Sequence, residues 1–441
     1  MTNDIIIGRD ESDKKKLGDK GLVYMGKHYV KMGQTTSLSN RILIDVARPH
    51  VILVSGKRGS GKSTTISVLA EEMLKLPKEI SQQLSIVMFD TMGIFWTMKY
   101  PNKREEDLLN EWNLKPDTFN VTIYAPSGYF KNYKKYGIPV DIPFTIKTSE
   151  LNAEDWCNVF DLEITSNIGI LIERTLSQLQ DQTYGIDEII KEIQKDKKPD
   201  ENTKNAAENR FQAVKSWGLF DKHGTEINDL IMPGKVSILD LSAYTHISGS
   251  TNIKSIAISI ISRKLLSDRI KARKIEELKD IEKSSFLFSE NEENKKEMPL
   301  VWFLLDESHE FLPRDKKTPA TDALVQILRE GRQPGISLVL ATQQPGEIHR
   351  DVITQTDVVI SHRLTAKRDI EALNAMSQSY LVADIQRYLN ELPSLKGSAI
   401  ILDDNSERIY PVKIRPRISW HGGETPSAVF IKKKELVSLG L

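Results

Sequence analysis

The 441-residue sequence contains a single cysteine, Cys157, so no disulfide can form within the chain. This scarcity is typical of proteins in a reducing cytosol. Because Trp156 and Phe160 are close in sequence, we expect Cys157 to be a small core residue rather than a nucleophile. No apolar run approaches the roughly 18 residues that a membrane-spanning helix needs, and the first residues lack the apolar stretch of a signal peptide. We therefore expect a cytoplasmic protein without a membrane segment.

The sequence also lacks an excess of either charge, because Lys and Arg together number 61 and so do Asp and Glu. A neutral chain lacks the overall positive charge typical of nucleic-acid-binding proteins. Any DNA contact must therefore come from a local basic patch or from a ring of such patches in an oligomer. The sequence shows no metal site with His-x-x-His spacing and no set of residues typical of a nuclease active site. The length suggests two or three structural units, and the hydrophobic fraction of 39% is sufficient for a core.

The most informative stretch is a glycine-rich turn between an apolar run at residues 51–54 and a helical pattern. Gly56 and Gly61 are five positions apart and are followed by Lys62 and Ser63, which is the G-x-x-x-x-G-K-[ST] phosphate loop in its strand–loop–helix context. Lys62 is expected to reach the β- and γ-phosphates of ATP, and the Ser63 hydroxyl to bind Mg²⁺. The alternative is a glycine-rich turn without a ligand. The predicted nucleotide-binding residues of the loop are Gly56, Lys57, Arg58, Gly59, Ser60, Gly61, Lys62, Ser63 and Thr64.

A second motif ends the apolar run at residues 300–305 with Asp306 and Glu307, the Walker B arrangement. Asp306 is predicted to hold Mg²⁺ together with Ser63, and Glu307 to activate the attacking water as a general base. The alternative is an apolar strand that ends in two solvated acids. Gln343 ends another strand-like run and is either a sensor of the γ-phosphate or an ordinary strand-end amide.

Apolar runs that end in acids alternate with helical patterns along the chain, which predicts an α/β fold with a mostly parallel sheet and the nucleotide at its C-terminal edge. A charged run from Lys195 to Asn205 reads as an exposed loop, and residues 252–279 as a long helix. Five segments are predicted: a small, barrel-like N-terminal β-element (1–48), the first part of the core (49–101), a mainly helical insertion (102–229), the second part of the core (230–415) and a C-terminal tail (416–441).

These motifs together resemble one family. The order and spacing of VSGKRGSGKST, VMFD, LVWFLLDESHEF, REGRQPGISLVLATQQP and VVISHRL are similar to those of the HerA branch of the HerA/FtsK superfamily. The resemblance covers roughly residues 45–101 and 230–415. It implies RecA-like domains in a hexameric ring, ATP hydrolysis between subunits and translocation of double-stranded DNA through a central pore, often with a nuclease partner.

The resemblance also assigns further residues. Lys62, Glu307 and Gln343 keep the roles given above, and Arg332 falls where the family has an arginine finger that reaches the next subunit's γ-phosphate. Arg329, one helical turn earlier, is an alternative finger, and either arginine can instead be a surface residue. Arg48 matches a second basic position near the nucleotide. The N-terminal segment is shorter than the barrel usual in the family.

Two functions follow from these predictions. The first is a ring ATPase that moves or remodels double-stranded DNA with a nuclease or another effector, in DNA repair or anti-phage defence. The second is a nucleotide-gated hexameric scaffold that licenses an effector without much translocation. A third function, a conjugative or chromosome-partition pump, is disfavoured because no membrane span is predicted. The segment 246–252 and the pair Lys103 and Arg104 are the candidate DNA contacts.

Overall fold

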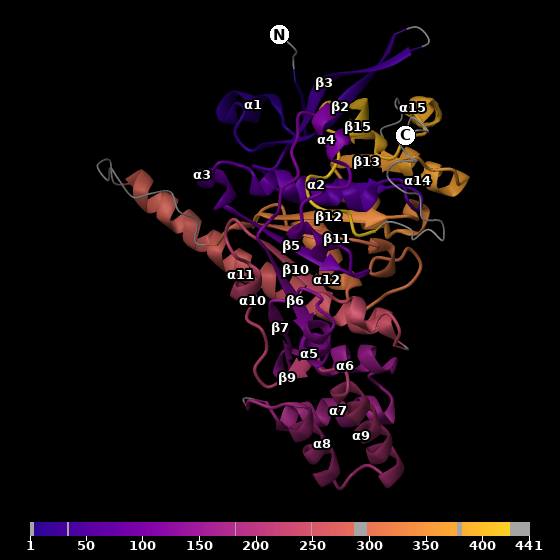
Figure 1. Ribbon diagram of the computed structural model, residues 1–441. Coiled ribbons are helices and arrows are strands. Elements are labelled where there is room, and N and C mark those ends of the chain that lie inside the picture. The colour runs from indigo at the N-terminus through magenta and orange to yellow at the C-terminus, as the bar shows by residue number, and fades with distance from the viewer. Residues whose placement is uncertain are drawn as a thin grey trace.

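The computed structural model describes residues 4–32, 35–180, 182–247, 249–285, 298–376 and 382–423 (Figure 1). Within these residues, 13 strands form one sheet in the order β1-β3-β2-β15-β14-β13-β4-β12-β11-β5-β10-β6-β7, and β8 and β9 form a separate pair. The strands are β1 (Ile5–Ile7), β2 (Leu22–Met32), β3 (Thr35–Asp45), β4 (Val51–Ser55), β5 (Leu84–Asp90), β6 (Val121–Pro126), β7 (Ile142–Phe144), β8 (Ile146–Lys147), β9 (Phe220–Asp221), β10 (Val236–Asp240), β11 (Leu300–Leu305), β12 (Ile336–Thr342), β13 (Val358–His362), β14 (Ser398–Asp403) and β15 (Arg408–Ile414).

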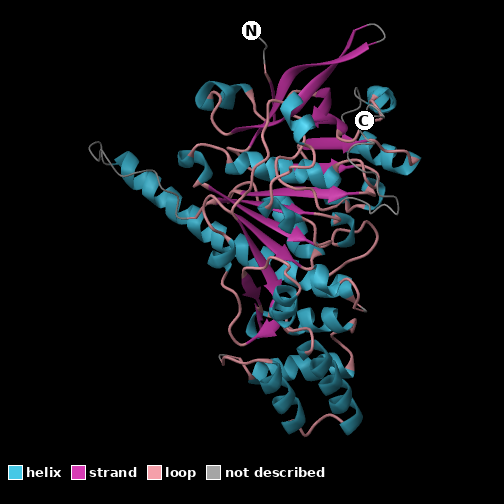
Figure 2. Cartoon of the chain, viewed as in Figure 1, coloured by secondary structure: helices cyan, strands magenta, loops and turns pink. Residues whose placement is uncertain are grey.

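Helices cover the sheet and form a separate body beyond one end of it (Figure 2). None of the helices in the described ranges is both long and apolar enough to cross a membrane. The helices are α1 (Glu11–Leu17), α2 (Lys62–Leu74), α3 (Lys78–Ser81), α4 (Glu106–Glu111), α5 (Ser127–Lys135), α6 (Ala153–Phe160), α7 (Asn167–Gln178), α8 (Ile186–Lys195), α9 (Glu201–Lys215), α10 (Ile227–Leu230), α11 (Ser250–Ser285), α12 (Thr321–Glu330), α13 (Arg350–Gln355), α14 (Lys367–Met376) and α15 (Val382–Glu391).

The strands from β13 to β7 are all parallel to their neighbours. Their near-continuous apolar composition fits this arrangement, because a parallel sheet is covered by helices on both faces. Along β11, Phe303 and Leu305 face one apolar cluster, whereas Trp302 and Leu304 face the other. Helices α11 and α12 pack on the first face and α2 on the second. The predicted α/β fold with a mostly parallel sheet is therefore confirmed.

The N-terminal strands continue this sheet instead of forming a separate body. β13 pairs antiparallel with β14, β14 with β15, β15 with β2, and β2 with β3. The close approach of β2 to β15 requires glycine at Gly26, because a Cβ there would lie 2.1 Å from the Lys413 carbonyl oxygen. The segment 1–48 thus lengthens the sheet on the side of β13, and the boundaries of the five predicted segments remain predictions.

The segment 102–229 is more mixed than predicted. Helices α6 to α9 form the helical body at the lower end of Figure 2, but β6 and β7 extend the main sheet. Cys157 is buried there beside Trp156, whose ring packs against Phe160, Phe211 and Phe220. The loop predicted from Lys195 is wrong beyond residue 200, because the Asp200 side chain caps α9 and the helix begins at Glu201.

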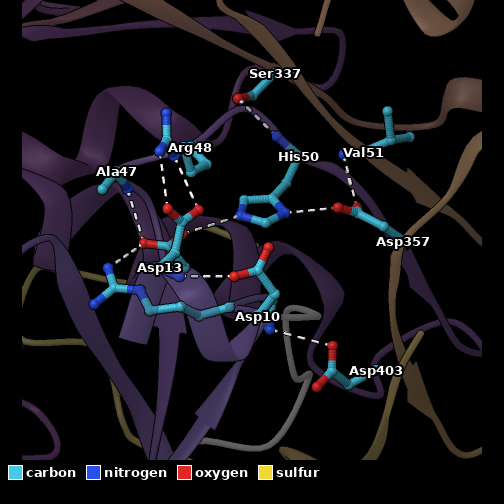
Figure 3. A network of polar contacts seen from close by, with 12 residues as sticks. Asp10, Asp13, Ala47, Arg48, His50, Val51, Ser337, Asp357 and Asp403 are labelled. Atoms are coloured by element: carbon cyan, nitrogen blue, oxygen red, sulfur yellow. Dashed lines mark hydrogen bonds and ion pairs between the residues drawn. The ribbon is translucent and has the colours of Figure 1, made fainter. Parts of the chain in front are cut away.

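A buried polar network joins the N-terminal strands to the core at the edge where β4 begins (Figure 3). His50 Nδ1 lies 2.6 Å from Asp357 Oδ2, and His50 Nε2 lies 3.6 Å from Asp45 Oδ2. Asp45 also pairs with Arg9 at 2.5 Å. Burial by itself lowers the pKa of His50, but the contacts with Asp357 and Asp45 prevail and raise it to about 9. The imidazolium therefore holds two carboxylates from different parts of the chain.

The segment after β15 is part of the core as far as the structure follows it. The buried Glu71 of α2 accepts hydrogen bonds from Arg415 Nη2 at 2.9 Å and from the Ser419 backbone N–H at 3.0 Å. Arg417 is buried beside them, and this burial lowers its pKa to about 10. The first residues of the predicted tail, 416–419, thus fasten the helix that follows the phosphate loop. Residues 424–441 lie outside the described part of the chain.

Candidate nucleotide site

The phosphate loop connects β4 to α2 at the C-terminal edge of the parallel sheet. Gly56, Gly59 and Gly61 have φ values of 153°, 75° and 121°, a region that favours glycine. A Cβ on Gly56 would lie 2.5 Å from Ser60 Oγ and 2.6 Å from His362 Cβ. The tight curl of the loop is therefore possible only with glycine at this position.

Two neighbouring segments hold the loop from outside. The Lys57 N–H donates to the Arg363 carbonyl at 3.1 Å, and the Gly397 N–H donates to the Ser60 carbonyl at 3.1 Å. Lys57, Arg58 and Gly59 are exposed, so the tip of the loop faces solvent. The loop is thus held at the Lys57 backbone by the residue that follows β13 and at Ser60 by the turn before β14, and its side chains at 57–59 are open to solvent.

Lys62 begins α2 and is buried. Its ammonium donates to the carbonyl oxygens of Gly56 at 3.0 Å and Lys57 at 3.3 Å. Burial lowers the pKa of Lys62, while the nearby Glu307 and Asp306 carboxylates oppose that shift. A cation held against the loop carbonyls beside two acids has the chemistry to bind phosphate oxygens. Thr64 lies in the same first turn of α2.

The predicted metal ligands are brought together. Ser63 Oγ donates to Asp306 Oδ2 at 3.3 Å, although 243 positions separate the two residues. Burial, and then the charge of Glu307, raises the pKa of Asp306 to about 6. A hydroxyl beside a carboxylate is an all-oxygen donor pair of the kind that Mg²⁺ takes together with water and phosphate oxygens. The described residues contain no cluster of three or more His, Cys, Asp or Glu side chains that could hold a metal on its own.

Glu307 has an unusual backbone and an unpaired oxygen. Its φ is 48°, in the left-handed region that non-glycine residues rarely adopt. Gln343 Nε2 donates to Glu307 Oε1, whereas the buried Oε2 has no hydrogen-bond partner among the described residues. His309 Nδ1 lies 3.6 Å from that Oε2. The arrangement leaves one carboxylate oxygen available to accept a proton, and it gives Gln343 and His309 positions beside the predicted base.

The three predicted arginines do not lie at this edge. Arg332 follows α12 and precedes β12, so it lies at the N-terminal edge of the sheet, where it is exposed and has no ion-pair partner among the described residues. Arg329 is paired with Asp351 at 2.6 Å. Arg48 precedes β4 and forms two hydrogen bonds with Asp13, at 3.0 and 2.8 Å (Figure 3). The structure therefore does not bring Arg48 to the phosphate loop of its own chain.

Sequence reasoning missed His362, the last residue of β13. His362 Nε2 lies 2.8 Å from Thr65 Oγ1, and His362 Nδ1 lies 3.1 Å from the Ser398 carbonyl oxygen. Burial lowers the pKa of His362 to about 4, so the ring is neutral at pH 7. The ring thus supports both Gly56 and the first turns of α2. The one feature of the sequence that could have drawn attention to His362 is its position at the end of the strand-like run VVISHRL.

Comparison with known proteins places the chain in a known group. Residues 30–265 match the family described as the central domain of helicase HerA. The DNA double-strand break repair helicase HerA of Sulfurisphaera tokodaii is 23% identical over 367 residues, which cover 82% of this chain and 64% of that protein. A probable helicase of Methanocaldococcus jannaschii is 23% identical over 397 residues, which cover 86% of this chain and 65% of that protein. The chain thus spans just under two thirds of the length of these curated relatives.

Two solved structures show the same fold. VirB4 of Thermoanaerobacter pseudethanolicus has a TM-score of 0.53 at 11% identity, covering 90% of this chain and 97% of VirB4. The bacterial conjugative coupling protein TrwB has a TM-score of 0.50 at 14% identity, covering 86% of this chain and 88% of TrwB. At such identities the likeness concerns the fold alone, a RecA-like α/β fold.

Proposed function

The chain belongs to the family of the HerA helicase central domain, and from this premise we propose that it is an ATP-hydrolysing ring motor, a homo-hexamer that translocates on or remodels double-stranded DNA. It acts with a separate nuclease or other effector, in DNA repair or anti-phage defence. The observation that supports this proposal best is the division of the predicted catalytic residues between the two edges of the sheet.

One edge carries a nearly complete hydrolytic site. Lys62, Ser63, Asp306, Glu307 and Gln343 converge at the C-terminal ends of β4, β11 and β12. The predicted finger that would stabilise the charge developing on the transferred phosphoryl group, Arg332, is not at this edge; the arginines beside the loop are the exposed Arg58 and Arg363, which donates to Ser394 Oγ at 2.7 Å. Arg332 supplies such a group from the opposite edge. Stacking of one copy's Arg332 edge on the next copy's nucleotide edge completes each site, and repetition of that contact around an axis closes a ring.

The roles of the individual groups follow from their positions. Ser63 and Asp306 would hold Mg²⁺, which would supply positive charge beside the phosphates of ATP. Lys62 exchanges its loop carbonyls for phosphate oxygens. The free Oε2 of Glu307 accepts the proton of the attacking water, and Gln343 fixes the orientation of that carboxylate from the other oxygen.

The proposed DNA contacts are local. Lys103 and Arg104 are exposed. The segment 246–252 comprises the end of the loop between β10 and α11 and the first residues of α11, at the nucleotide edge, and Ser248 within it lies outside the described residues. In a ring, six copies of such loops surround a pore. Binding of duplex DNA should then weaken steeply with salt as phosphate contacts release counterions.

The test measures mass in solution and ATP turnover. We expect a hexamer, at least with nucleotide, and turnover that rises when duplex DNA is added. Lys62→Ala should abolish tight nucleotide binding, because the loop loses its phosphate-binding cation. Unchanged nucleotide affinity in that variant would overturn the site, and a monomer with and without nucleotide would overturn the ring.

A nucleotide-gated hexameric scaffold for an effector is the second candidate. The equal counts of basic and acidic residues, 61 each, favour it, because a motor that grips DNA usually carries excess positive charge. The two candidates differ in turnover. A scaffold should bind ATP with slow hydrolysis that duplex DNA leaves unchanged, whereas a motor should be stimulated by duplex DNA.

A further inference from the structure

Helix α5 follows β6 and stays near the edge of the sheet that holds the nucleotide site. It comprises nine residues, Ser127–Lys135. The next strand, β7, pairs only with the last three residues of β6, from Tyr124 to Pro126, so the chain between the two strands does not return to the opposite edge. Figure 1 shows α5 close to β6 and β7, above helices α7, α8 and α9 in this view.

Three lysines form one side of α5. Lys131, Lys134 and Lys135 are exposed, and at 3.6 residues per turn they lie within an arc of about 100° around the helix axis. Ser127 is the one other residue of α5 in that arc, so no acidic or apolar side chain interrupts it. Tyr129 lies on the opposite side of the helix. We call the three lysines the α5 basic face.

The charge of the α5 basic face is not balanced by nearby acids. Its lysines have no ion-pair partner among the described residues, and the sequence contains no acidic residue between Asp117 and Asp141. Asp141 itself is paired with Lys99, whose Nζ lies 2.6 and 2.7 Å from its two carboxylate oxygens. Lys134 Nζ lies 4.5 Å from the centroid of the Phe130 ring, a contact that orders the side chain and keeps its charge. Helix α5 is therefore a local excess of positive charge.

The opposite side of α5 is fixed to the turn that leads into residues 246–252. The Tyr129 ring packs edge-on against Tyr244, with ring centroids 5.5 Å apart. The Tyr133 hydroxyl lies 3.5 Å from Ser242 Oγ. Ser242 and Tyr244 belong to a 3₁₀ turn directly after β10, the strand beside β6. The α5 basic face and the segment 246–252 therefore leave neighbouring strands at the same edge of the sheet.

The start of α5 is held by the chain that follows α9. The Gly128 N–H donates to the Gly218 carbonyl at 3.1 Å, and a Cβ on Gly218 would lie 2.3 Å from Gly128 Cα. The helix is thus fixed at its start and along its tyrosine side, and it presents its lysines to solvent in a set order. Such preorganisation lowers the entropic cost of binding a ligand with a regular row of charges.

We infer that the α5 basic face binds the phosphate backbone of double-stranded DNA, next to the segment 246–252. The inference rests on the proposed function and adds a contact surface to it. Lysines bind phosphates as point charges without reading sequence, and a neutral chain needs such a local excess of positive charge to bind DNA. Tyr136, directly after α5, is 76% exposed and adds a hydroxyl of the kind that bonds to phosphate oxygens.

The first test removes the three charges. The triple variant Lys131→Gln, Lys134→Gln and Lys135→Gln keeps long polar side chains of similar helix propensity. It should weaken duplex binding at least about tenfold at about 0.1 M salt, and the salt dependence should become shallower by about one unit of slope per lysine in each copy that contacts DNA. Nucleotide affinity and turnover without DNA should be unchanged, because four strands separate β6 from β4 in the sheet.

Two controls accompany this variant. Lys191→Gln, Lys197→Gln and Lys198→Gln together remove the same charge from exposed positions of the helical body, and this variant should bind duplex DNA like the wild-type chain. A triple arginine variant of the α5 basic face keeps the charge and should also bind like the wild-type chain.

The second test locates the duplex. In a Cys157→Ser background, a photo-crosslinker on Asn132→Cys, beside the α5 basic face, should attach to duplex DNA, whereas the same group on Lys198→Cys should not. Intact DNA binding without a crosslink from position 132 would overturn the inference.

The remaining outcomes separate the α5 basic face from the proposed motor. If the triple glutamine variant and its helical-body control bind duplex DNA equally well, the face is not a DNA contact, and the motor stands. If the glutamine variant keeps its DNA affinity and loses a protein partner, the face docks an acidic protein surface instead, and the inference is overturned. A wild-type chain that binds no duplex DNA overturns the proposed function, and the inference with it.

Discussion

The His362 ring lies 2.8 Å from the Thr65 hydroxyl, and it connects the end of β13 to the second turn of the helix that follows the phosphate loop. Its other nitrogen, 3.1 Å from the Ser398 carbonyl, must be the protonated one, because a carbonyl only accepts. The Thr65 hydroxyl therefore donates to His362 Nε2. A neutral histidine of one defined tautomer thus supports the loop from the side of β13.

This relationship predicts that His362 is a positioning residue. His362→Ala should raise KM for ATP by about tenfold with a smaller effect on kcat, because the loop loses its support and the Thr65 hydroxyl is left with the Gly61 carbonyl, 3.2 Å away, as its partner. His362→Gln, whose amide oxygen can accept from Thr65, should restore most of the affinity. Steady-state kinetics of both variants measures the split. If the two variants change kcat and KM to the same extent, the His362 ring only stabilises the fold.

The sequence was sufficient for those parts of the site that a local pattern encodes. Asp306 and Glu307 follow an apolar run, and a parallel strand places whatever follows it at the C-terminal edge, beside the loop after β4. His362 could not be found in this way, because its role depends on pairing β13 with β4 and β14. The same limit applies to β2, whose partner β15 is more than 370 positions away.

Other differences have local causes. The run from Lys195 has few apolar residues, so no helical period revealed α9, although Asp200 at its start is a capping residue. Arg48 was expected near the nucleotide because it matches a basic position near the nucleotide in the family that the sequence resembles. A strand separates Arg48 from the phosphate loop, however, and the length of β4 places them at opposite edges of the sheet.

Glu307→Gln should retain ATP binding and lower turnover by about 100-fold or more, because an amide cannot accept the proton of the attacking water. The matched control is Glu310→Gln, three residues later and half-buried; this change should have little effect on turnover. Binding of a fluorescent nucleotide and release of phosphate are the two measurements. Near-wild-type turnover in Glu307→Gln would show that another group is the base.

The His50 network predicts a pH dependence of stability. The pKa of His50 is raised to about 9 in the folded chain, against about 6.5 when unfolded. The stabilisation is therefore complete below about pH 6.5 and is lost as pH rises through 9, by about 3 kcal/mol in total. Denaturant unfolding between pH 6 and 9.5 measures it.

In that experiment His50→Gln should lower the free energy of unfolding most at pH 6 and least at pH 9.5, because only the wild-type chain gains from the charged ring. His223→Gln, at an exposed position, serves as the control. Parallel pH profiles for the wild-type and His50→Gln chains would contradict the assignment of the charge to His50.

The two arginines near the end of α12 differ in their surroundings, and this difference separates their roles. Arg329 is held by Asp351 at 2.6 Å, whereas Arg332 has no ion-pair partner among the described residues. Arg332→Ala should therefore lower turnover by about 10³-fold while leaving nucleotide affinity intact, as for other arginine fingers. Arg329→Ala removes an ion pair between an exposed arginine and the largely buried Asp351 at the edge away from the phosphate loop, and should change turnover little.

A mixture of two inactive proteins tests whether Arg332 acts in the next copy. In mixed rings of Arg332→Ala and Glu307→Gln subunits, some interfaces combine an intact Glu307 from one copy with an intact Arg332 from its neighbour, so ATP turnover should partly return. A parallel titration of wild-type into mutant subunits shows whether a ring tolerates inactive sites. If the titration shows such tolerance and subunits exchange, yet the mixture stays inactive, then Arg332 does not act across the interface. Because Arg332 and the phosphate loop lie at opposite edges of the sheet, recovery is the result we expect.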